Sequence, residues 1–399
     1  MESLPNGFRY AGVSCGIKTK PNTKDVALIV SDHPCVGAGV YTTNQVVAAP
    51  VVLSRTRTPS DSMRAIVVNS GNANACTGTR GMNDAKKMTE LAAQALGIKD
   101  AESVLVMSTG VIGRFLPMEK IEKGILDASQ KLGTTMSHFH DAVDGISTTD
   151  AFRKLTTRHV DLGSHGQYSI AGMAKGAGMI GPKMATMLGI VVTDAPLTQS
   201  QARQLLQQAV DRSFNCISVE GHMSTNDTVV LLSSGIGLGK PPLNAEGEKA
   251  FAAQLESMCI QLAKQIPEDG EGATHLIEIQ VEGAASPSDA DTIARSVALS
   301  NLVKTAITGG DPNWGRIVSA VGYAGVPIET EHLALKLNGF DLFDRGEPLA
   351  FDAKAVSHAI KEKKDTLIQL KVGTGPGKAS HWTTDLNCEY VRFNSEYTT

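Results

Sequence analysis

The chain has 399 residues, and its 42% hydrophobic content is sufficient for a sizeable core in one large or two medium domains. Its 37 lysines and arginines nearly balance 41 aspartates and glutamates, and no basic run is interleaved with aromatic residues, so nucleic acid is not an expected partner. No apolar run reaches membrane-spanning length, and the N-terminus has no basic and apolar regions typical of a signal peptide. We therefore expect a cytoplasmic protein that does not interact with a membrane.

Six cysteines are scattered along the chain without any C-x-x-C pair. This spacing predicts neither a disulfide framework nor a zinc site. The short run from His138 to Asp144 contains histidines and aspartates, but it matches no recognisable metal motif and is interpreted as the polar start of a helix. We therefore expect no metal and no cofactor.

The first part of the chain alternates strands, loops of small residues and helices. Apolar residues at helical spacing, followed by Gly97 as a terminating glycine, predict a helix over Asn83–Leu96. Pro117 stands where a second helix would start. The strands expected from apolar runs in this part are 25–30, 36–40, 65–70 and 103–107.

Two polar loops in this part are candidate site elements. The loop Ser108–Gly113 follows an expected strand, and Thr109 and Gly110 could direct a hydroxyl and a backbone N–H group at a developing oxyanion. An ordinary strand-to-helix turn would explain the same residues. The polar junction Ser147–Asp150 suits contacts to a polar ligand, but it suits a helix cap equally well.

The stretch Ala174–Asp194 combines a glycine-rich loop with an apolar, β-branched segment. Its glycines permit a sharp bend immediately before a buried strand, and Thr186 lies at that bend. A threonine hydroxyl held over the preceding carbonyl could cut the chain at Ala185–Thr186. The α-amino group so released, with an ordinary pKa of about 8, could then serve as general base for the Thr186 hydroxyl.

Two other interpretations fit the same stretch. Gly176–Gly181 formally matches the dinucleotide-binding pattern G-x-G-x-x-G. That pattern requires a helix to start within the glycines, whereas the residues that follow are typical of a strand, and Asp194 comes too soon to bind a ribose. A purely structural hairpin is the stronger alternative.

The second half of the chain continues the alternation. Thr198 and Gln201 predict a capping box for a helix over 199–210, and the polar run Val219–Thr228 leads into a buried strand as a candidate site lining. A polar tail beginning at Arg392 would ordinarily be frayed. Other expected elements are a linker at 235–244, a helix at 247–266, a helix from 286 through 302 that restarts after 309–316, and strands at 186–194, 228–234, 275–281, 334–337 and 366–372.

Several motifs together resemble those of the ornithine acetyltransferase family, also called glutamate N-acetyltransferase. The resemblance extends from Gly7 to Thr399, and the combination of motifs is highly specific although each one alone is weak. The matching blocks are RAIVVNSGNANACTG (64–78), STGVIG (108–113), TTD (148–150), MAKGAGMI and MATML (173–180 and 184–188), STNDT (224–228), DGEGAT (269–274), DPNWGRI (311–317) and the C-terminal N-x-x-Y-T-T.

The resemblance implies a layered α/β fold in which two processed segments, 1–185 and 186–399, share one core. It also implies a smaller C-terminal α/β region, which we expect from about residue 243. Such an enzyme cuts itself between Ala185 and Thr186. It then uses Thr186 as a nucleophile to carry acetyl from N²-acetylornithine to glutamate by ping-pong chemistry, within arginine biosynthesis. The expected assembly is a heterotetramer of two copies of each segment.

By matching motif positions, the resemblance also assigns the site residues. Thr109 and Gly110 would form the oxyanion hole. The expected substrate-binding residues are one of Thr148 and Thr149, together with Lys175, Thr186, Glu271, Asn394 and Thr399. A substrate with a carboxylate, an amide and an amine calls for a cation, an anion and neutral donors, and Lys175 and Glu271 supply the two charges.

One departure concerns the run Glu220-Gly-His-Met223, where the family usually has D-G-D-T before STNDT. This departure leaves the donor or acceptor preference open, and no motif decides whether acetyl-CoA also serves as donor. A self-processed N-terminal-nucleophile amidase or aminopeptidase, which passes its acyl group to water, is the nearer alternative. A nucleotide-binding regulator built on the glycine loops is the more distant one.

Overall fold

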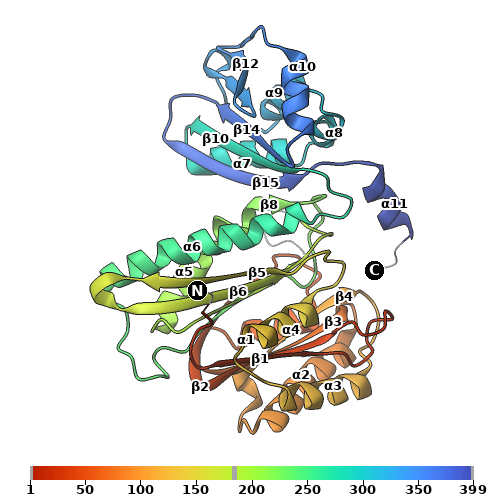
Figure 1. Cartoon of the computed structure of the whole chain (residues 1–399), viewed down its shortest axis with the longest axis vertical. Coiled ribbons are helices and arrows are strands. Elements are labelled where there is room, and N and C mark those ends of the chain that lie inside the picture. The colour runs from red at the N-terminus through yellow and green to blue at the C-terminus, as the bar shows by residue number, and fades with distance from the viewer. Residues whose placement is uncertain (1–2, 182–186, 397–399) are drawn as a thin grey trace.

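The computed structural model describes residues 3–181 and 187–396. Within these ranges the chain forms two sheets with helices packed against them, which is the layered α/β arrangement expected from the sequence (Figure 1). The first sheet has eight strands in the order β4-β3-β2-β9-β7-β6-β5, with β1 paired to β2. Its strands are β1 Phe8–Val13, β2 Val26–Tyr41, β3 Ser60–Asn72, β4 Val104–Val111, β5 Lys154–Asp161, β6 Gln167–Lys175, β7 Leu188–Thr193 and β9 Thr228–Ser233.

Helices cover both faces of this first sheet. Alternate residues of β9 point to opposite faces, so Val230 packs in the cluster with helix α4, while Val229 packs with α5 and α6. On the face that α5 and α6 cover, but at the other end of the sheet, α2 and α3 pack against β2 and β3. The bounds of these helices, together with α1, are α1 Ala49–Thr56, α2 Gly78–Leu96, α3 Met118–Gln130, α4 Met136–Ile146, α5 Gln199–Asp211 and α6 Ala245–Glu268.

Within the first sheet, two strands that follow the predicted cleavage position lie between strands that precede it. β7 pairs antiparallel with β6 and parallel with β9, and β9 in turn pairs antiparallel with β2. All six residues of β7 and all six of β9 are buried, because each strand has neighbouring strands on both edges and helices on both faces of the sheet. The predicted segments 1–185 and 186–399 therefore both contribute strands to this sheet.

The second sheet has seven strands in the order β13-β12-β11-β14-β10-β15-β8, and helices α7 to α10 pack beside it at the top of Figure 1. Apart from the short strand β8, the strands of this sheet begin at Leu276, whereas α6, which follows residue 243, packs in the core of the first sheet. The strands are β8 Ile217–Ser218, β10 Leu276–Ala284, β11 Ala334–Leu337, β12 Phe340–Asp344, β13 Glu347–Pro348, β14 Asp365–Lys371 and β15 Gly377–Thr384. The helices are α7 Pro287–Ala298, α8 Asn301–Gly309, α9 Trp314–Gly322 and α10 Ala353–Lys361.

Local capping explains where several elements begin and end. The capping box of Thr198 and Gln201 is confirmed at the start of α5, and Gly97 ends α2 with a positive φ of 66°. The helix expected from 286 through 302 is divided, because the Ser300 side chain accepts a hydrogen bond from the Val303 N–H and starts α8. The frayed tail is a wrong prediction as far as residue 396, since Cys388–Glu396 forms helix α11.

Candidate active site

A cavity of about 130 Å³ lies where the end of β4, the glycine-rich loop after β6 and helix α11 meet. Thr148, Thr149, Glu271 and the segment 224–226 complete its wall. The cavity brings together seven of the residues predicted from the sequence, namely Thr109, Gly110, Thr148, Thr149, Lys175, Glu271 and Asn394. These residues are up to 285 positions apart in the chain (Asn394 against Thr109, by subtraction of their numbers), so the fold and not local sequence assembles them.

Thr109 and Gly110 lie near the C-terminal end of strand β4, where they are paired with Ser70 and Gly71 of β3. Gly110 has a φ of +130°, and a Cβ atom there would stand 2.3 Å from the carbonyl carbon of Gly71, so only glycine fits. The buried Lys175 ammonium donates a hydrogen bond of 2.9 Å to the Thr109 hydroxyl oxygen. Because that oxygen accepts from Lys175, the hydroxyl's own hydrogen is directed elsewhere and can serve as a donor.

Glu271 lies across the cavity and is held by two neutral donors. The Thr149 hydroxyl donates to Glu271 Oε1 and the Asn394 amide donates to Glu271 Oε2, each at 3.1 Å. Burial raises the pKa of Glu271, and the two hydrogen bonds oppose that rise. A Cβ at Gly178 would come within 2.4 Å of the Glu271 carboxyl group, so a larger residue there would displace this carboxylate from its present position.

A buried network of charges fixes the loops around the cavity. Asp150 accepts hydrogen bonds from the Gly176 and Thr148 N–H groups at 2.8 Å each, and it forms an ion pair of 2.7 Å with Lys154. Lys154 also contacts Asp269, and its side chain is completely buried. Burial raises the pKa of Asp150, but the ammonium groups of Lys154 and Lys175 outweigh burial and lower it to about 2.

Lys18 is a cavity residue that the sequence did not predict. The Asp25 carboxylate accepts hydrogen bonds from four consecutive backbone N–H groups, those of residues 15–18, and so shapes the loop that carries Lys18. The Lys18 ammonium donates to the carbonyl oxygens of Lys24 and Ser147, and burial lowers its pKa to about 8. No sequence pattern indicates this position, since only the folded loop brings it to the cavity.

Three residues of the STNDT block, Ser224, Thr225 and Asn226, line the cavity, as expected for the candidate lining in 219–228. The Asn226 amide donates to the carbonyl oxygens of Ala73 and Ser108, which ties this block to the end of β4. In the departing run just before it, His222 and Met223 are not among the described residues that line the cavity.

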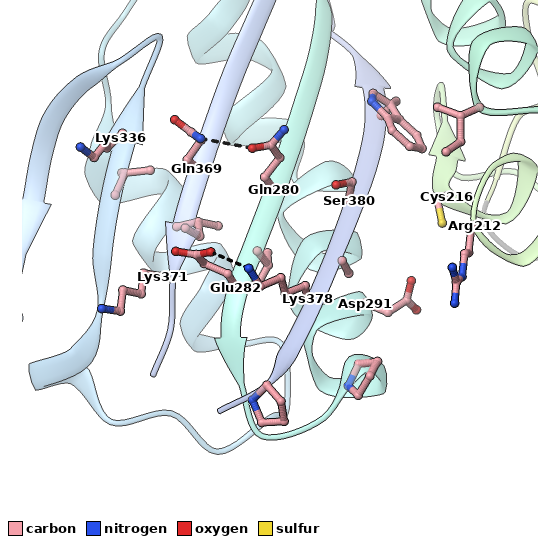
Figure 2. Close-up of a pocket in the computed structure, with 18 of the residues that line it drawn as sticks. Arg212, Cys216, Gln280, Glu282, Asp291, Lys336, Gln369, Lys371, Lys378 and Ser380 are labelled. Atoms are coloured by element: carbon pink, nitrogen blue, oxygen red, sulfur yellow. Dashed lines mark hydrogen bonds and ion pairs between the residues drawn. The ribbon is translucent and has the colours of Figure 1, made fainter. Parts of the chain in front are cut away.

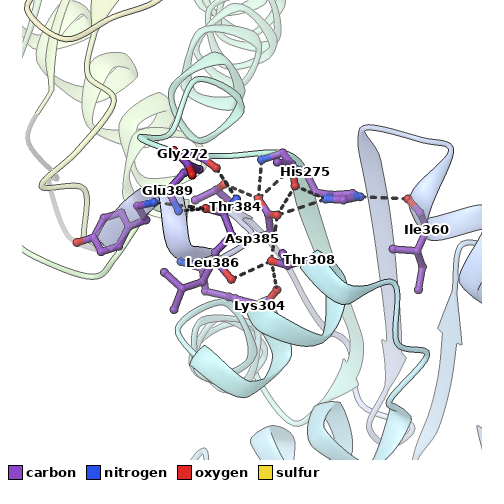
Figure 3. A network of polar contacts seen from close by, with 12 residues as sticks. Gly272, His275, Lys304, Thr308, Ile360, Thr384, Asp385, Leu386 and Glu389 are labelled. Carbon is purple, nitrogen blue, oxygen red and sulfur yellow. Dashed lines mark hydrogen bonds and ion pairs between the residues drawn. The ribbon is translucent and has the colours of Figure 1, made fainter. Parts of the chain in front are cut away.

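Helix α11 reaches the cavity because a polar network around Asp385, just before the helix, holds this part of the chain against the segment 269–274 (Figure 3). Asp385 accepts hydrogen bonds from the Thr274 N–H and hydroxyl groups, from the His275 N–H group and from the Thr308 hydroxyl group. The Asp385 hydrogen bond raises the pKa of His275. Burial alone would raise the pKa of Asp385, but the bonds from His275 and Thr274 lower it overall. The side chain of Asn387 then donates to the Gly272 carbonyl oxygen at 2.6 Å and starts the helix.

Three predicted site residues, Ala185, Thr186 and Thr399, lie outside the described residues. The described chain on both sides of 182–186 is anchored beside the cavity. The Ile180 carbonyl oxygen accepts from the Val219 and Gly221 N–H groups, and the Met187 N–H group donates to the buried Asp227 carboxylate at 3.0 Å. Gly178 and Met179 themselves line the cavity.

By fold and cavity the protein is a layered α/β protein with an internal polar site of small-molecule size. A family model described as the ArgJ family matches residues 9–399. The chain is 52% identical to the arginine biosynthesis bifunctional protein ArgJ of Rhodopirellula baltica over 99% of this chain and 96% of that protein. For the protein of the same name from Symbiobacterium thermophilum the identity is 46% over 100% and 98%.

Among solved structures, the chain is similar to ornithine acetyltransferase complexed with ornithine from Mycobacterium tuberculosis. The identity is 38%, the TM-score is 0.42, and the match covers 45% of this chain and 93% of that one. The chain belongs to the ArgJ family. The family resemblance found in the sequence motifs is thereby confirmed, and the predicted place in arginine biosynthesis agrees with the names of the relatives.

Proposed function

We propose that the protein is a glutamate N-acetyltransferase that moves acetyl from N²-acetylornithine to glutamate through an acetyl ester of Thr186. The observation that carries the proposal is the convergence of Thr109, Gly110, Lys175 and Glu271 on one cavity, beside the anchored residues Ile180 and Met187. A cation and an anion in a cavity of this size suit an amino acid with a carboxylate and a second amine. The name "bifunctional" carried by the relatives favours acetyl-CoA as a second donor.

The proposed nucleophile is created by self-cleavage. The Thr186 hydroxyl oxygen attacks the Ala185 carbonyl carbon, the C–N bond breaks, and the resulting ester is hydrolysed by water. This leaves a carboxylate on Ala185 and a free α-amine on Thr186. In each turnover the neutral α-amine takes the Thr186 hydroxyl proton while the oxygen attacks the acetyl carbonyl carbon, and the departing ornithine amine receives that proton.

The proposed oxyanion hole consists of the Thr109 hydroxyl and the Gly110 N–H group. The 2.9 Å bond from Lys175 occupies the Thr109 oxygen as an acceptor, which leaves its hydrogen to donate to the tetrahedral oxyanion. In the second half of the reaction the neutral amine of glutamate attacks the acetyl ester, and the same two donors stabilise that intermediate. The ester C–O bond then breaks, and the proton lost by the attacking amine passes through the Thr186 α-amine to the Thr186 oxygen, which restores the hydroxyl. Ornithine leaves before glutamate enters, because the cavity is sized for one amino acid.

Two measurements on the purified protein test this proposal. Denaturing electrophoresis should resolve fragments 1–185 and 186–399 in place of a chain of 42.1 kDa. Intact-mass analysis after incubation with N²-acetylornithine alone should then show one acetyl group on the fragment 186–399. A fully active single chain would overturn the cleavage, and acetyl transfer only when both substrates are present would overturn the ester intermediate.

The nearer alternative is an N-terminal-nucleophile amidase, which has the same ester intermediate but releases acetate. Isotope-labelled N²-acetylornithine separates the two, since labelled N-acetylglutamate supports the transferase and labelled acetate in the presence of glutamate supports the amidase. We further propose a cytoplasmic heterotetramer with two copies of each fragment. Among the described residues, no helix has both the length and the apolar character to cross a membrane.

A further inference from the structure

We propose that Cys216, Asp291 and His381 form a zinc-binding site at the junction of the two sheets, separate from the acyl-transfer cavity. One ligand atom from each of these three side chains lies within 4.8 Å of the other two. They come from three different elements: the turn before β8, helix α7 and strand β15. The scattered cysteines predict no zinc site, because these three donors are too far apart in the sequence to form a recognisable motif.

Strand pairing explains why Cys216 and His381 meet. β8 pairs in parallel with β15, with Ile217 opposite Trp382, so the preceding residues of the two strands point together to the opposite face. His381 is also opposite Ile279, whose side chain packs in the cluster that contains helix α7. The shared face of Cys216 and His381 therefore looks toward α7, the helix that carries Asp291.

Asp291 completes the group. Its Oδ1 atom lies 2.7 Å from His381 Nε2, and its Oδ2 atom accepts a hydrogen bond of 2.9 Å from Arg295 on the next turn of the helix. The Arg295 bond is an outer-shell contact that would orient the carboxylate. A tetrahedral zinc site with bonds of about 2.0–2.3 Å places its donor atoms roughly 3.4–3.7 Å apart, so modest side-chain shifts would admit the ion.

The chemistry of the donors favours zinc over harder cations. A thiolate, an imidazole and a carboxylate together suit Zn²⁺, whereas Mg²⁺ and Ca²⁺ prefer oxygen ligands throughout. The Cys216 thiol would release its proton on binding the metal, because the thiolate is the ligand form. His381 is fully buried, and within the described chain its Nδ1 atom has no hydrogen-bond partner.

The site also has an entry path. Cys216 and Asp291 line a hollow of about 1150 Å³ beside the second sheet, and Figure 2 shows both of them on the same side of that hollow, with Arg212 next to Cys216. Solvent in this hollow can supply the fourth ligand. Because Cys216 packs in the core cluster of the first sheet and Asp291 lies on α7, which packs against the second sheet, the bound ion would tie the two cores together.

The test uses the full-length protein without a histidine tag. Titration with Co²⁺ as a spectroscopic substitute for zinc should give a thiolate-to-cobalt charge-transfer band and tetrahedral d–d bands at one equivalent. Cys216→Ala should abolish the charge-transfer band, and Cys216→Ala and His381→Gln should each weaken binding at least tenfold. Cys259→Ala is the matched control, since Cys259 is also a buried thiol in the same core cluster, and it should leave the spectrum unchanged.

A second measurement does not depend on the spectrum. Zinc should raise the melting temperature of the wild-type protein and of Cys259→Ala, because it binds only the folded state. It should not raise that of Asp291→Asn, which keeps the size of the side chain. Absence of a thiolate band in the wild-type protein, or equal cobalt affinity in wild type and Cys216→Ala, would overturn the site. Either result would leave an ordinary histidine–aspartate hydrogen bond, with no consequence for acetyl transfer.

Discussion

At the scale of single residues, the cavity divides its polar groups into those expected to act on the reacting carbonyl and those expected to hold the substrate. Thr109 belongs to the first kind, since its hydroxyl oxygen is occupied by Lys175 and its hydrogen remains available. Glu271 belongs to the second, because neutral donors fix both of its oxygens at the cavity wall. This division leads to different kinetic expectations for the two residues.

We predict that Thr109→Ala lowers kcat about 100-fold, on the scale of one lost oxyanion donor, with little change in KM. Steady-state kinetics with N²-acetylornithine and glutamate would measure both constants. Thr89→Ala is a suitable control, because Thr89 is also buried but its hydroxyl donates to the Lys86 carbonyl oxygen within α2, away from the cavity. A Thr109→Ala enzyme with wild-type kcat would remove this residue from the oxyanion hole.

Asp150 supports a prediction about stability against acid. Its folded-state pKa of about 2 lies below its ordinary value, so its stabilising effect is present above about pH 4 and is lost as the pH falls toward 2. The shift corresponds to roughly 2 kcal/mol of unfolding free energy, and the side chain is almost completely buried. Asp150→Asn should therefore lower stability at pH 7 by about that amount and flatten its decline between pH 4 and 2. Denaturant unfolding across that pH range measures both effects.

Many residues of the site could be predicted, because their motifs can be recognised in the sequence without knowledge of the fold. Thr109 and Gly110 fit either an oxyanion hole or an ordinary strand-to-helix turn, and the family resemblance favours the first. Lys18 could not be predicted in this way, since its position depends on Asp25 binding four backbone N–H groups. The oxyanion and substrate-binding roles themselves stay predictions.

At the scale of elements, the helix α11 is the feature that sequence reasoning missed most clearly. None of its residues is buried, so no stripe of buried apolar side chains indicates a helix. What stabilises it is a long-range contact, namely the network of Asp385 with Thr274, His275 and Thr308 shown in Figure 3. Local signals did predict elements that depend on their own residues, such as the capping box of α5.

We predict that Asp385→Asn loosens α11 and thereby weakens substrate binding. The amide cannot accept all the hydrogen bonds that the carboxylate accepts, which should cost about 1–3 kcal/mol. Losing the position of Asn394 would free Glu271 Oε2, so KM should rise severalfold while kcat changes little. Hydrogen exchange should show faster exchange in residues 388–396, and Asp365→Asn, at the exposed start of β14, is the control. An unchanged KM with faster exchange would exclude α11 from substrate binding.

At the scale of the whole molecule, the strand order of the first sheet links the two predicted segments. β7 and β9, which follow residue 186, lie between β6 and β2, which precede it, and each makes a full ladder with its neighbour. The sequence predicted β7 and β9 from their apolar runs. It could not predict their neighbours, because pairing between β2 and β9 joins residues about 190 positions apart, as Val36 opposite Ser233 illustrates.

This interleaving predicts that cleavage at Ala185–Thr186 does not separate the fragments. Separation would expose both faces of β7 and β9, which are fully buried, at roughly 25 cal/mol for each Å² of apolar surface. Gel filtration of the cleaved protein without denaturant should therefore give a single peak containing both fragments. In denaturant the fragments should part in one cooperative transition, because they share a core. Fragments that elute separately under native conditions would show that the two halves of this sheet fold independently.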